Sequence, residues 1–262
     1  MILKDGTKLF VRFERKERGK PAFVFLHGDG QNHTIWASFS EYFLSKGHGV
    51  LCYDLPGHGL SQPYKGGKYS FPRFAETLKQ VLERYKVGRP IIVGNSTGGM
   101  IALQYAIQEP DNVSGVVAVS SCDESPSKHK RGIPSMIRNF VKDSERLFQG
   151  QKAFDYSKPV LNEEDILLAA MKNTSPEAVK GNLEAMMKFS IRSKLGRIKS
   201  PVLLIGGEKD VFVNGEWAKR TQREIPNSRL VTVKGFGHHL LIQAPKKVLK
   251  IIKENYSFFV QR

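Results

Sequence analysis

One serine in this chain lies in a sequence that could make it a nucleophile. Ser96 is the centre of a Gly-x-Ser-x-Gly pattern, with Gly94 two residues before it and Gly98 two residues after it. The apolar run 91–93 precedes the pattern and an apolar stretch follows it. A serine at a tight turn between a strand and a helix is held above the end of the strand, and small neighbours leave room for the chain to double back. The pattern therefore predicts that Ser96 is a nucleophile at a strand-to-helix turn.

The helix after such a turn would support the same chemistry. Its first N–H groups have no partners within the helix, and the helix dipole is positive at this end. Both features favour negative charge that develops on a carbonyl oxygen under attack. A hydroxyl is a weak nucleophile at neutral pH, so Ser96 also needs a base to accept its proton and an acid to orient that base.

The elements that would position Ser96 alternate along the chain. Short apolar runs, typical of strands buried on both faces of a parallel sheet, occur at 22–26, 50–53, 91–93, 115–119, 201–205 and 229–233. Helical patterns occur at 35–45, 71–85, 98–108, 214–225 and 245–258. At the N-terminus, the turn pair Asp5-Gly6 between residues 2–3 and 8–13 favours a β-hairpin. This alternation predicts an α/β fold with a mostly parallel central sheet flanked by helices.

One region departs from the alternation. Between about 123 and 192 there is no buried strand pattern, and helical patterns rich in Lys, Met and Phe are broken at Pro134, Pro159 and Pro176. We interpret this region as an inserted α-helical cap. The predicted division is a core of residues 1–122 and 193–262 and a cap of residues 123–192.

Four motifs occur in an order that resembles the α/β-hydrolase family. They are His27-Gly28-Asp29-Gly30, the loop 54–61, the Gly-x-Ser-x-Gly turn and the late pair Gly237-His238. Together they span nearly the whole chain and are more specific than any one of them. The resemblance implies catalytic residues in the order Ser, acid, His, and a helical cap where region 123–192 lies.

The resemblance implies that His238 is the general base, because it lies in a Gly-His loop upstream of Pro245. The adjacent His239 is the alternative. Two other histidines fall in loops that the family uses structurally: His27 and His58. Three more are expected on the surface or in loops: His33, His48 and His129.

Asp210 is the acid that the resemblance implies, because it follows the strand before the last one. Glu208, two residues earlier, is a weaker candidate. Some relatives carry the acid one strand earlier, which would point to Asp123 or Glu124. The other interpretation of Asp123 is a loop residue or a helix N-cap.

Two backbone N–H groups are expected to form an oxyanion hole. One belongs to Thr97, the residue after the nucleophile. The other is expected from Asp29, with Gly30 as the alternative. A carboxylate that pointed at the oxyanion would repel it, so the Asp29 side chain is predicted to point away.

The substrate pocket is expected between the cap and the core, with four candidate residues: Trp36, Met186, Phe189 and His239. Trp36 is expected near the entrance. Other apolar cap side chains either line an acyl pocket or attach the cap to the core: Met136, Phe140, Phe148, Phe154, Met171 and Met187. No cap residue obviously recognises a carboxylate, although three arginines are available: Arg131, Arg138 and Arg192.

Composition argues against several other classes of protein. The formal net charge is +16, but Lys and Arg are scattered and the densest run, 128–131, has no interleaved aromatic residue. A solvated surface is therefore favoured over a nucleic-acid interface.

Cys52 and Cys122 lie in apolar stretches and are interpreted as reduced core thiols. No apolar run approaches the roughly 18 residues of a membrane span, which predicts a cytoplasmic protein.

These features favour a carboxylesterase that acts on a small ester with a short-to-medium acyl group, and the sequence does not determine its oligomeric state. Ser96 argues against dehalogenases and epoxide hydrolases of the same fold, which use Asp at the turn. The form Gly-Asn-Ser-x-Gly-Gly is frequent in carbon–carbon bond hydrolases of vinylogous diketones, the main alternative. Lactone hydrolysis, perhydrolysis and a non-catalytic binding protein are further alternatives. Neither a metal nor another cofactor is expected, since no metal-ligand or phosphate-loop motif occurs.

Overall fold

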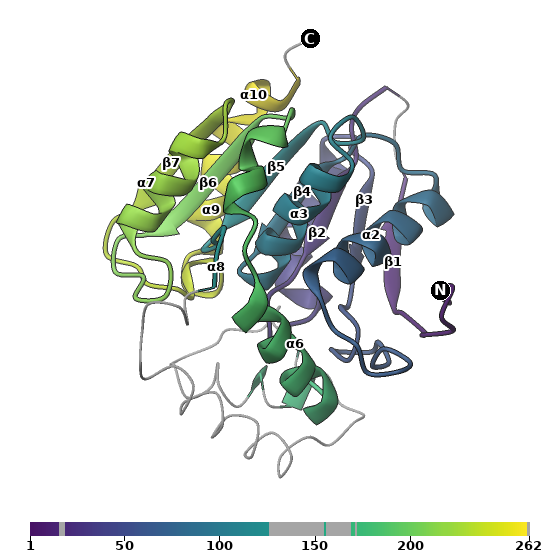
Figure 1. The fold of residues 1–262 in the computed structure, drawn as a ribbon. Coiled ribbons are helices and arrows are strands. Elements are labelled where there is room, and N and C mark those ends of the chain that lie inside the picture. Colours follow the sequence, from purple (N-terminus) through teal and green to yellow (C-terminus); the bar gives the residue numbers. More distant parts are fainter. Residues whose placement is uncertain (16–18, 126–154, 156–168, 171, 261–262) are drawn as a thin grey trace.

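A seven-stranded sheet with the order β1-β3-β2-β4-β5-β6-β7 lies at the centre of the computed structural model (Figure 1). The structure describes residues 1–15, 19–125, 155, 169–170 and 172–260. The strands are β1 (Val11–Glu14), β2 (Phe23–Leu26), β3 (Val50–Tyr53), β4 (Ile91–Asn95), β5 (Gly115–Val119), β6 (Val202–Gly207) and β7 (Ser228–Val233). β1 pairs antiparallel with β3, and the other neighbours are parallel. The predicted mostly parallel sheet is confirmed.

Strands β2 to β5 are buried along their whole length, as their continuous apolar runs predict. Successive side chains of a strand point to opposite faces of the sheet. Phe23 and Phe25 of β2 therefore join the core cluster on one face, and Val24 and Leu26 join the cluster on the other face. The sheet thus separates two hydrophobic cores.

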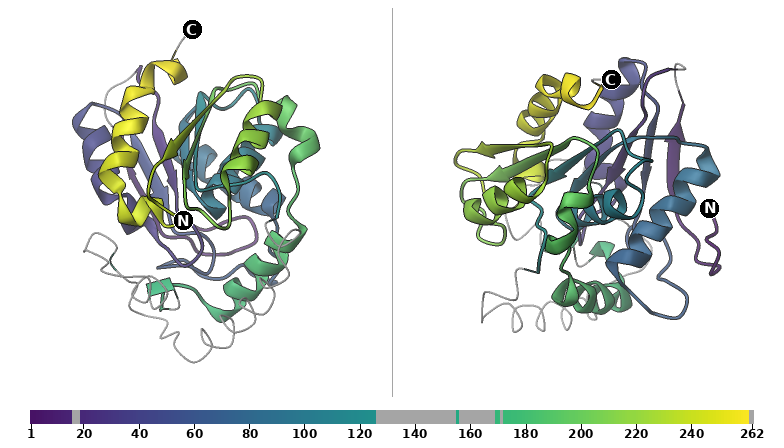
Figure 2. Two further views of the ribbon diagram at one scale, coloured as in Figure 1. Left: turned by 90° about the vertical axis from the view of Figure 1, so that its left-hand side faces the viewer. Right: turned by 45° about the horizontal axis from the view of Figure 1, so that its top comes forward.

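Helices cover both faces of the sheet (Figure 2). On one face lie α1 (Ala37–Ser45), α9 (Pro245–Glu254) and α10 (Tyr256–Val260). On the other face lie α2 (Phe71–Tyr85), α3 (Thr97–Gln108) and α7 (Gly215–Glu224). The shorter segments are η1 (His33–Trp36), η3 (Arg192–Arg197) and α8 (Leu240–Gln243). This layering confirms the predicted α/β class with helices on both sides of the sheet.

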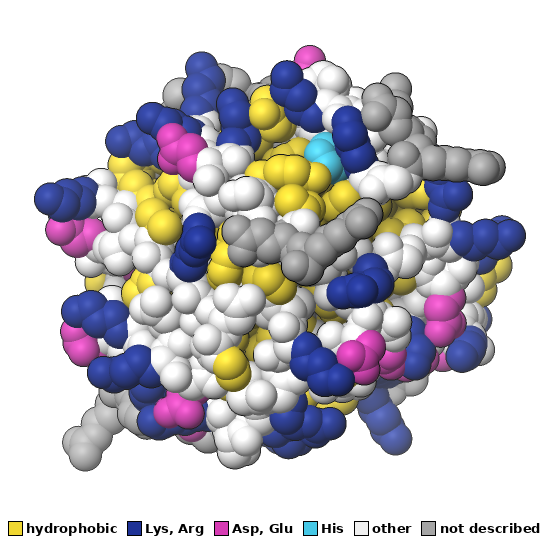
Figure 3. Space-filling view, turned by 90° about the horizontal axis from the view of Figure 1, so that it is seen from above, with side chains coloured by type: hydrophobic (Ala, Val, Ile, Leu, Met, Phe, Trp, Pro, Cys, Tyr) yellow, Lys and Arg dark blue, Asp and Glu magenta, His cyan; other side chains and the backbone are white. Residues whose placement is uncertain are grey.

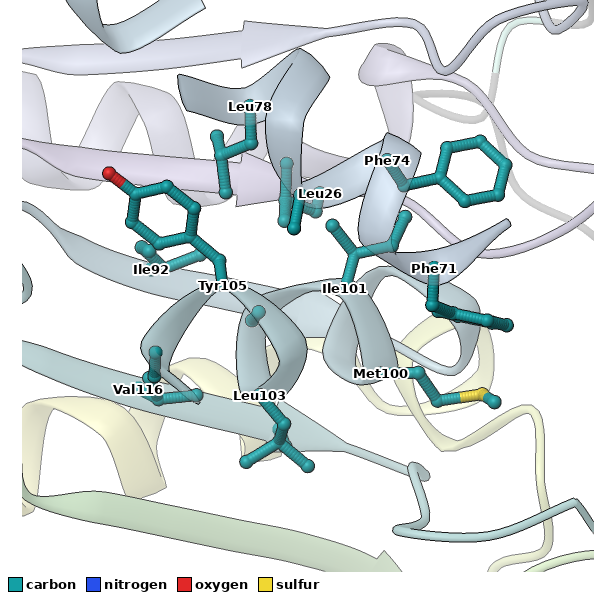
Figure 4. Packing of buried hydrophobic residues seen from close by; sticks show 14 of the residues in the cluster. Leu26, Phe71, Phe74, Leu78, Ile92, Met100, Ile101, Leu103, Tyr105 and Val116 are labelled. Carbon is teal, nitrogen blue, oxygen red and sulfur yellow. The ribbon is translucent and has the colours of Figure 1, made fainter. Parts of the chain in front are cut away.

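The core beneath α2 and α3 fixes the helix that begins after Ser96. Figure 4 shows buried side chains of α3 packed against side chains of α2 and of strands β2, β4 and β5. The labelled residues are Met100, Ile101, Leu103 and Tyr105 of α3, Phe71, Phe74 and Leu78 of α2, and Leu26, Ile92 and Val116 of the strands. Burying one such large apolar side chain stabilises the fold by about 1.5–3 kcal/mol. The N-terminus of α3 is consequently held firmly against the carboxyl edge of the sheet.

The predicted helix 71–85 has the same bounds in the structure, and a local signal marks its first turn. Ser70 Oγ accepts a hydrogen bond from Arg73 N at 3.3 Å, which caps the first turn. The predicted helix 245–258 instead divides into α9 and α10 at Asn255. A short 3₁₀ turn, η1, forms the first part of the predicted helix 35–45.

The predicted N-terminal hairpin forms, and its second arm also takes a partner that was not predicted. An antiparallel bridge joins Ile2 to Lys8 across the Asp5-Gly6 turn, and the Leu9 N–H donates to the Met1 carbonyl at 2.8 Å. The longer strand β1 begins at Val11 and pairs with β3. The edge of β3 offers unpaired backbone N–H and C=O groups that an extended segment can satisfy, and a local pattern does not reveal this partner.

Two predictions about individual side chains have different outcomes. Cys52 and Cys122 are buried free thiols, and burial raises the pKa of each to about 12, as expected of core residues. His48 lies in the loop before β3, which was one of its two predicted settings, but it is not on the surface, because its ring packs edge-on against Phe23 and the residue is only 5% exposed. The hydrogen bond between His48 Nδ1 and the Pro21 carbonyl oxygen, 2.9 Å, makes this burial possible.

Most of the predicted cap lies outside the described residues, including His129, Arg131, Met136, Arg138, Phe140, Phe148, Phe154 and Met171. The longest described part is α6 (Pro176–Lys188), which lies beyond the carboxyl edge of the sheet in Figure 1. The division into core and cap therefore stays a prediction.

Surface charge, helix hydrophobicity and clusters of metal-ligating side chains bear on which partners the described part of the chain could bind. Lys and Arg side chains are spread over the face in Figure 3 between acidic, uncharged and apolar groups. No helix among the described residues is long and apolar enough to cross a membrane. Within the same residues, no group of three or more His, Cys, Asp or Glu side chains could hold a metal ion.

Candidate active site

Ser96 lies at the turn between β4 and α3 in a strained backbone conformation, with φ +49° and ψ −116°. A Cβ on Gly94 would collide with the backbone of Gly98, and a Cβ on Gly98 would collide with the Leu26 carbonyl. The two glycines are therefore required by space. Backbone strain of this kind costs about 1–3 kcal/mol, and the packing of β4 and α3 sustains it. The result is a half-buried Ser96 at the carboxyl edge of the sheet.

The structure brings three predicted site residues together. Ser96 Oγ lies 3.2 Å from His238 Nε2, and His238 Nδ1 lies 2.9 Å from Asp210 Oδ2. They come from the loops after β4, β7 and β6. Because an ionised carboxylate only accepts, Nδ1 carries the ring proton of a neutral His238. Nε2 then presents its lone pair to the Ser96 hydroxyl.

Asp210 is a buried carboxylate whose first oxygen is held by the backbone. Its Oδ1 accepts hydrogen bonds from the N–H groups of Phe212 and Val213, both at 2.8 Å. Burial raises the pKa of Asp210, but the hydrogen bond from His238 and these two backbone bonds together bring it below its ordinary value. Asp210 is therefore ionised at neutral pH, with Oδ2 directed at the histidine.

The loops after β6 and β7 hold each other in place. The Gly235 N–H donates to Glu208 Oε2 at 3.0 Å. A Cβ on Gly207 would collide with the carbonyl oxygens of Phe236 and Gly237, so the loop after β7 passes directly over this glycine. Glu208, the weaker acid candidate, holds loop backbone rather than the histidine ring.

The other two acid candidates pair with α7. Asp123 is fully buried, and its Oδ1 accepts from Arg220 Nη2 at 3.2 Å and from Thr221 Oγ1 at 3.1 Å. Glu124 lies 3.6 Å from the same Arg220. Neither carboxylate has a described contact with His238.

Two candidate pocket residues are core residues by their contacts. Trp36, expected near the pocket entrance, is fully buried instead, and its ring stacks on Phe25 with centroids 5.0 Å apart. Phe189 is also buried, with its ring 4.2 Å from that of Phe71. An indole or phenyl ring gains more from packing on other rings in the core than from partial exposure.

The other two candidates are half-buried. Met186 lies in the last turn of α6 and packs partly against the core. The ring of His239 lies 5.8 Å from that of His238. The structure puts His238, rather than His239, beside Ser96.

A second loop, after β2, approaches the turn at Ser96 and is braced by His27. The Leu55 N–H donates to His27 Nε2 at 2.9 Å, so the ring proton is on Nδ1 and donates to the Gly28 carbonyl at 2.8 Å. Burial lowers the pKa of His27 to about 4, which keeps the ring neutral. His27 is thus a structural residue of this loop.

Gln31 was not among the sequence candidates, although it connects the two loops. Its Oε1 accepts from the Gly28 N–H at 2.8 Å and from Asn95 Nδ2 at 3.0 Å. The signal that could have found it is its place one residue after the 27–30 motif.

Asp29 and Thr97, the two predicted oxyanion-hole residues, are in direct contact. Thr97 Oγ1 donates to Asp29 Oδ2 at 2.7 Å. Asn182 Nδ2, from α6, donates to Asp29 Oδ1 at 2.7 Å, and His58 Nε2 lies 3.7 Å from the same oxygen. Burial raises the pKa of Asp29, but interactions with His58, Thr97 and Asn182 bring it below its ordinary value. Asn182 was also missed, because no local pattern links α6 to a loop 153 residues away.

A mostly parallel sheet with a serine at a sharp strand-to-helix turn, and with an acid and a histidine after later strands, is the arrangement of α/β hydrolases. The family model described as alpha/beta hydrolase fold matches residues 21–245. The chain belongs to this family and is an α/β hydrolase.

Three similar proteins illustrate the range of the family. A 2-hydroxy-6-oxononadienedioate/2-hydroxy-6-oxononatrienedioate hydrolase of Burkholderia vietnamiensis is 28% identical, over 90% of this chain and 87% of that protein. A pimeloyl-[acyl-carrier protein] methyl ester esterase of Nitrosospira multiformis is 29% identical, over 87% and 92%. A solved structure from work on carboxylesterases of Nitrososphaera gargenis has a TM-score of 0.79 and 23% identity, covering 98% of this chain and 96% of that one.

Proposed function

We propose that the protein is a carboxylesterase that hydrolyses small esters with short-to-medium acyl groups. The observation that carries this proposal is the hydrogen-bonded series from Ser96 through His238 to Asp210 at the turn between β4 and α3. A nucleophile, a base and an ionised acid in this order form the acyl-transfer arrangement that recurs on unrelated folds.

In the first half of the proposed reaction, Ser96 Oγ attacks the ester carbonyl while His238 Nε2 takes the hydroxyl proton. The resulting imidazolium is stabilised by Asp210, which stays ionised. When the tetrahedral intermediate collapses, His238 gives the proton to the leaving alcohol and an acyl-Ser96 ester forms. In the second half, His238 takes a proton from water, which attacks the acyl-Ser96 carbonyl. The bond between the acyl carbon and Ser96 Oγ then breaks, His238 returns the proton to Oγ, and the carboxylic acid leaves.

The carbonyl oxygen becomes negatively charged in both halves. We assign its stabilisation to the backbone N–H groups of Thr97 and Asp29. Thr97 is the first residue of α3, so its N–H has no partner within the helix. A preorganised donor of this kind typically contributes about 10²–10³-fold to kcat.

A p-nitrophenyl ester series with acyl chains from acetate to octanoate tests the proposal. Ser96→Ala should lower kcat for the butyrate ester by about a thousandfold or more, because the nucleophile is lost. Ser45→Ala, at an exposed serine near the end of α1, is the matched control and should leave kcat unchanged. Wild-type protein that hydrolyses none of these esters would contradict the proposal.

The second candidate function is hydrolysis of a carbon–carbon bond in a vinylogous diketone. Two observations favour it: the named activity of the Burkholderia vietnamiensis relative and the Gly-Asn-Ser-x-Gly-Gly form of the turn. Incubation with 2-hydroxy-6-oxononadienedioate, followed by the loss of dienol absorbance, tests it directly. A kcat/KM above that for the butyrate ester would replace the esterase proposal.

A further inference from the structure

We propose that Asp29 is a positioning residue that fixes both predicted oxyanion donors to α6. This inference rests on the proposed function, in which the N–H groups of Asp29 and Thr97 receive the charged oxygen. We name this contact the Asp29 bridge: the Asp29 carboxylate accepts a hydrogen bond from Thr97 on one oxygen and from Asn182 on the other.

The Asp29 bridge joins three segments that are far apart in the chain. Thr97 is 68 residues and Asn182 is 153 residues from Asp29, and each donates at 2.7 Å to a different carboxylate oxygen. The side chain that receives these two bonds belongs to the residue whose N–H would serve as a donor. The orientation of that N–H, and of Thr97, therefore depends on the same pair of hydrogen bonds.

The negative charge of Asp29 lies beside the predicted oxyanion hole, where it is unfavourable for catalysis unless the carboxylate has a function of its own. A fixed negative charge beside a developing oxyanion opposes catalysis, and a neutral residue would avoid this penalty. A carboxylate, however, accepts on both oxygens at once, whereas an amide accepts on one side only. The hydroxyl and the amide that face Asp29 both act as donors, which matches the acceptor capacity of an ionised carboxylate.

Asn182 is oriented by the same carboxylate. Its side chain is buried, and its Oδ1 has no hydrogen-bond partner among the described residues. Turning the amide over would place this oxygen against the Asp29 carboxylate, so the bond from Nδ2 to Asp29 sets the orientation of the amide.

The segment that leads into α6 packs on the loop after β3 through its backbone. The Gly59 N–H donates to the Asn173 carbonyl at 2.8 Å, and the Ser175 N–H donates to the Gly57 carbonyl at 2.8 Å. A Cβ on Gly30 would collide with Ala170. The Asp29 bridge is thus a side-chain contact between α6 and the loop after β2, in addition to the hydrogen bond from Asn173 Nδ2 to the Gly30 carbonyl at 3.4 Å.

The first experiment removes the hydroxyl but keeps the shape of Thr97. Thr97→Val should lower kcat for p-nitrophenyl butyrate by about 10-fold and change KM less than about twofold, because ground-state binding does not need the oxyanion donors. Thr97→Ser keeps the hydroxyl and should restore kcat to within about twofold of wild type.

Thr221→Val is the matched control. Thr221 is also a buried threonine whose hydroxyl donates to a buried aspartate, Asp123, at 3.1 Å. Its substitution should lower the Tm and leave kcat unchanged. A fall in kcat with Thr221→Val as large as that with Thr97→Val would mean that both act through general stability, which would overturn the proposal.

The second experiment tests the link to α6. Asn182→Ala should lower kcat several-fold, and the double variant with Thr97→Val should lose less than the product of the two single losses, because both bonds orient one carboxylate. Wild-type kcat in both single variants, or losses that multiply, would overturn the Asp29 bridge while ester hydrolysis by the wild type still stands. Wild-type protein without ester hydrolysis would overturn the proposed function and this inference together.

Discussion

The loops after β5 and β6 each present a buried aspartate near the carboxyl edge of the sheet, yet only one of them meets the histidine. Asp123 follows β5 and Asp210 follows β6, and the side chains of both are fully buried. Burial therefore does not distinguish them. What differs is the set of groups around each carboxylate.

Asp123 faces a cation, whereas Asp210 faces backbone N–H groups and an imidazole. Arg220 and Thr221 hold Asp123 Oδ1, and the guanidinium neutralises the carboxylate. Two backbone N–H groups hold Asp210 Oδ1 without adding a charge, which leaves Oδ2 to His238. An acid that stabilises an imidazolium needs uncompensated negative charge, so the partners decide which aspartate suits that role.

The largest expected effect is the difference between the two aspartates when each is replaced by asparagine. Asp210→Asn should lower kcat for p-nitrophenyl butyrate by roughly 10³–10⁴-fold, because the amide favours the wrong tautomer of His238. Asp123→Asn should keep kcat within about twofold. Steady-state kinetics of both variants makes the comparison.

The outcomes of that pair separate activity from stability. Asp123→Asn should lower the free energy of unfolding by about 2 kcal/mol, since Arg220 loses a charged hydrogen-bond partner. If Asp123→Asn lost activity as severely as Asp210→Asn, the distinction drawn between the two loops would be wrong.

A smaller effect is expected from the glycines at the end of β6. Gly207→Ala introduces a Cβ that collides with the carbonyls of Phe236 and Gly237, which displaces the loop that carries His238. We expect kcat to fall by about 10–100-fold, as for misplaced catalytic groups. Gly206→Ala is the control, because a Cβ there meets nothing within 4 Å. Equal losses of kcat in both variants would show that the contact between Gly207 and the loop after β7 does not position His238.

The smallest effect concerns the pH dependence of stability. The pKa of Asp210 lies below its ordinary value of 3.8, so its ionised form stabilises the fold at all pH above that value. This contribution is lost as the pH falls through the lower folded-state pKa. The difference in Tm between wild type and Asp210→Asn should shrink as the pH falls below about 4. A difference that grows over this acidic range would have the wrong sign.

The local pattern of the sequence determined much of the fold. The apolar runs of β2 to β5, the helix 71–85 with its Ser70 cap, and the Gly94–Gly98 turn all depend on residues within a few positions of one another. Hydrophobic periodicity, capping and the need for room at a turn act over that same short range. These features could therefore be predicted without knowledge of distant contacts.

The site could be predicted only in part, because its residues meet through the order of the strands. The family resemblance implied Ser96, His238 and Asp210, with Asp123, Glu124 and Glu208 as alternative acids. That Asp210 is the one in contact with His238 follows only from the structure. Ser96 and His238 are 142 residues apart, and the parallel sheet brings their loops to one edge. No local signal records that Arg220 lies beside Asp123.

Several features were decided by tertiary structure alone. The pairing of β1 with β3, the burial of His48 and Trp36, and the contact between Asp29 and Asn182 each join segments that are distant in sequence. A side chain's own type sets what it can donate, accept or bury, and this chain's residue types and spacing determined its family. Which partner each side chain meets depends on packing, since close-packed interiors leave one arrangement of neighbours, and that arrangement exists only once the whole sheet has formed.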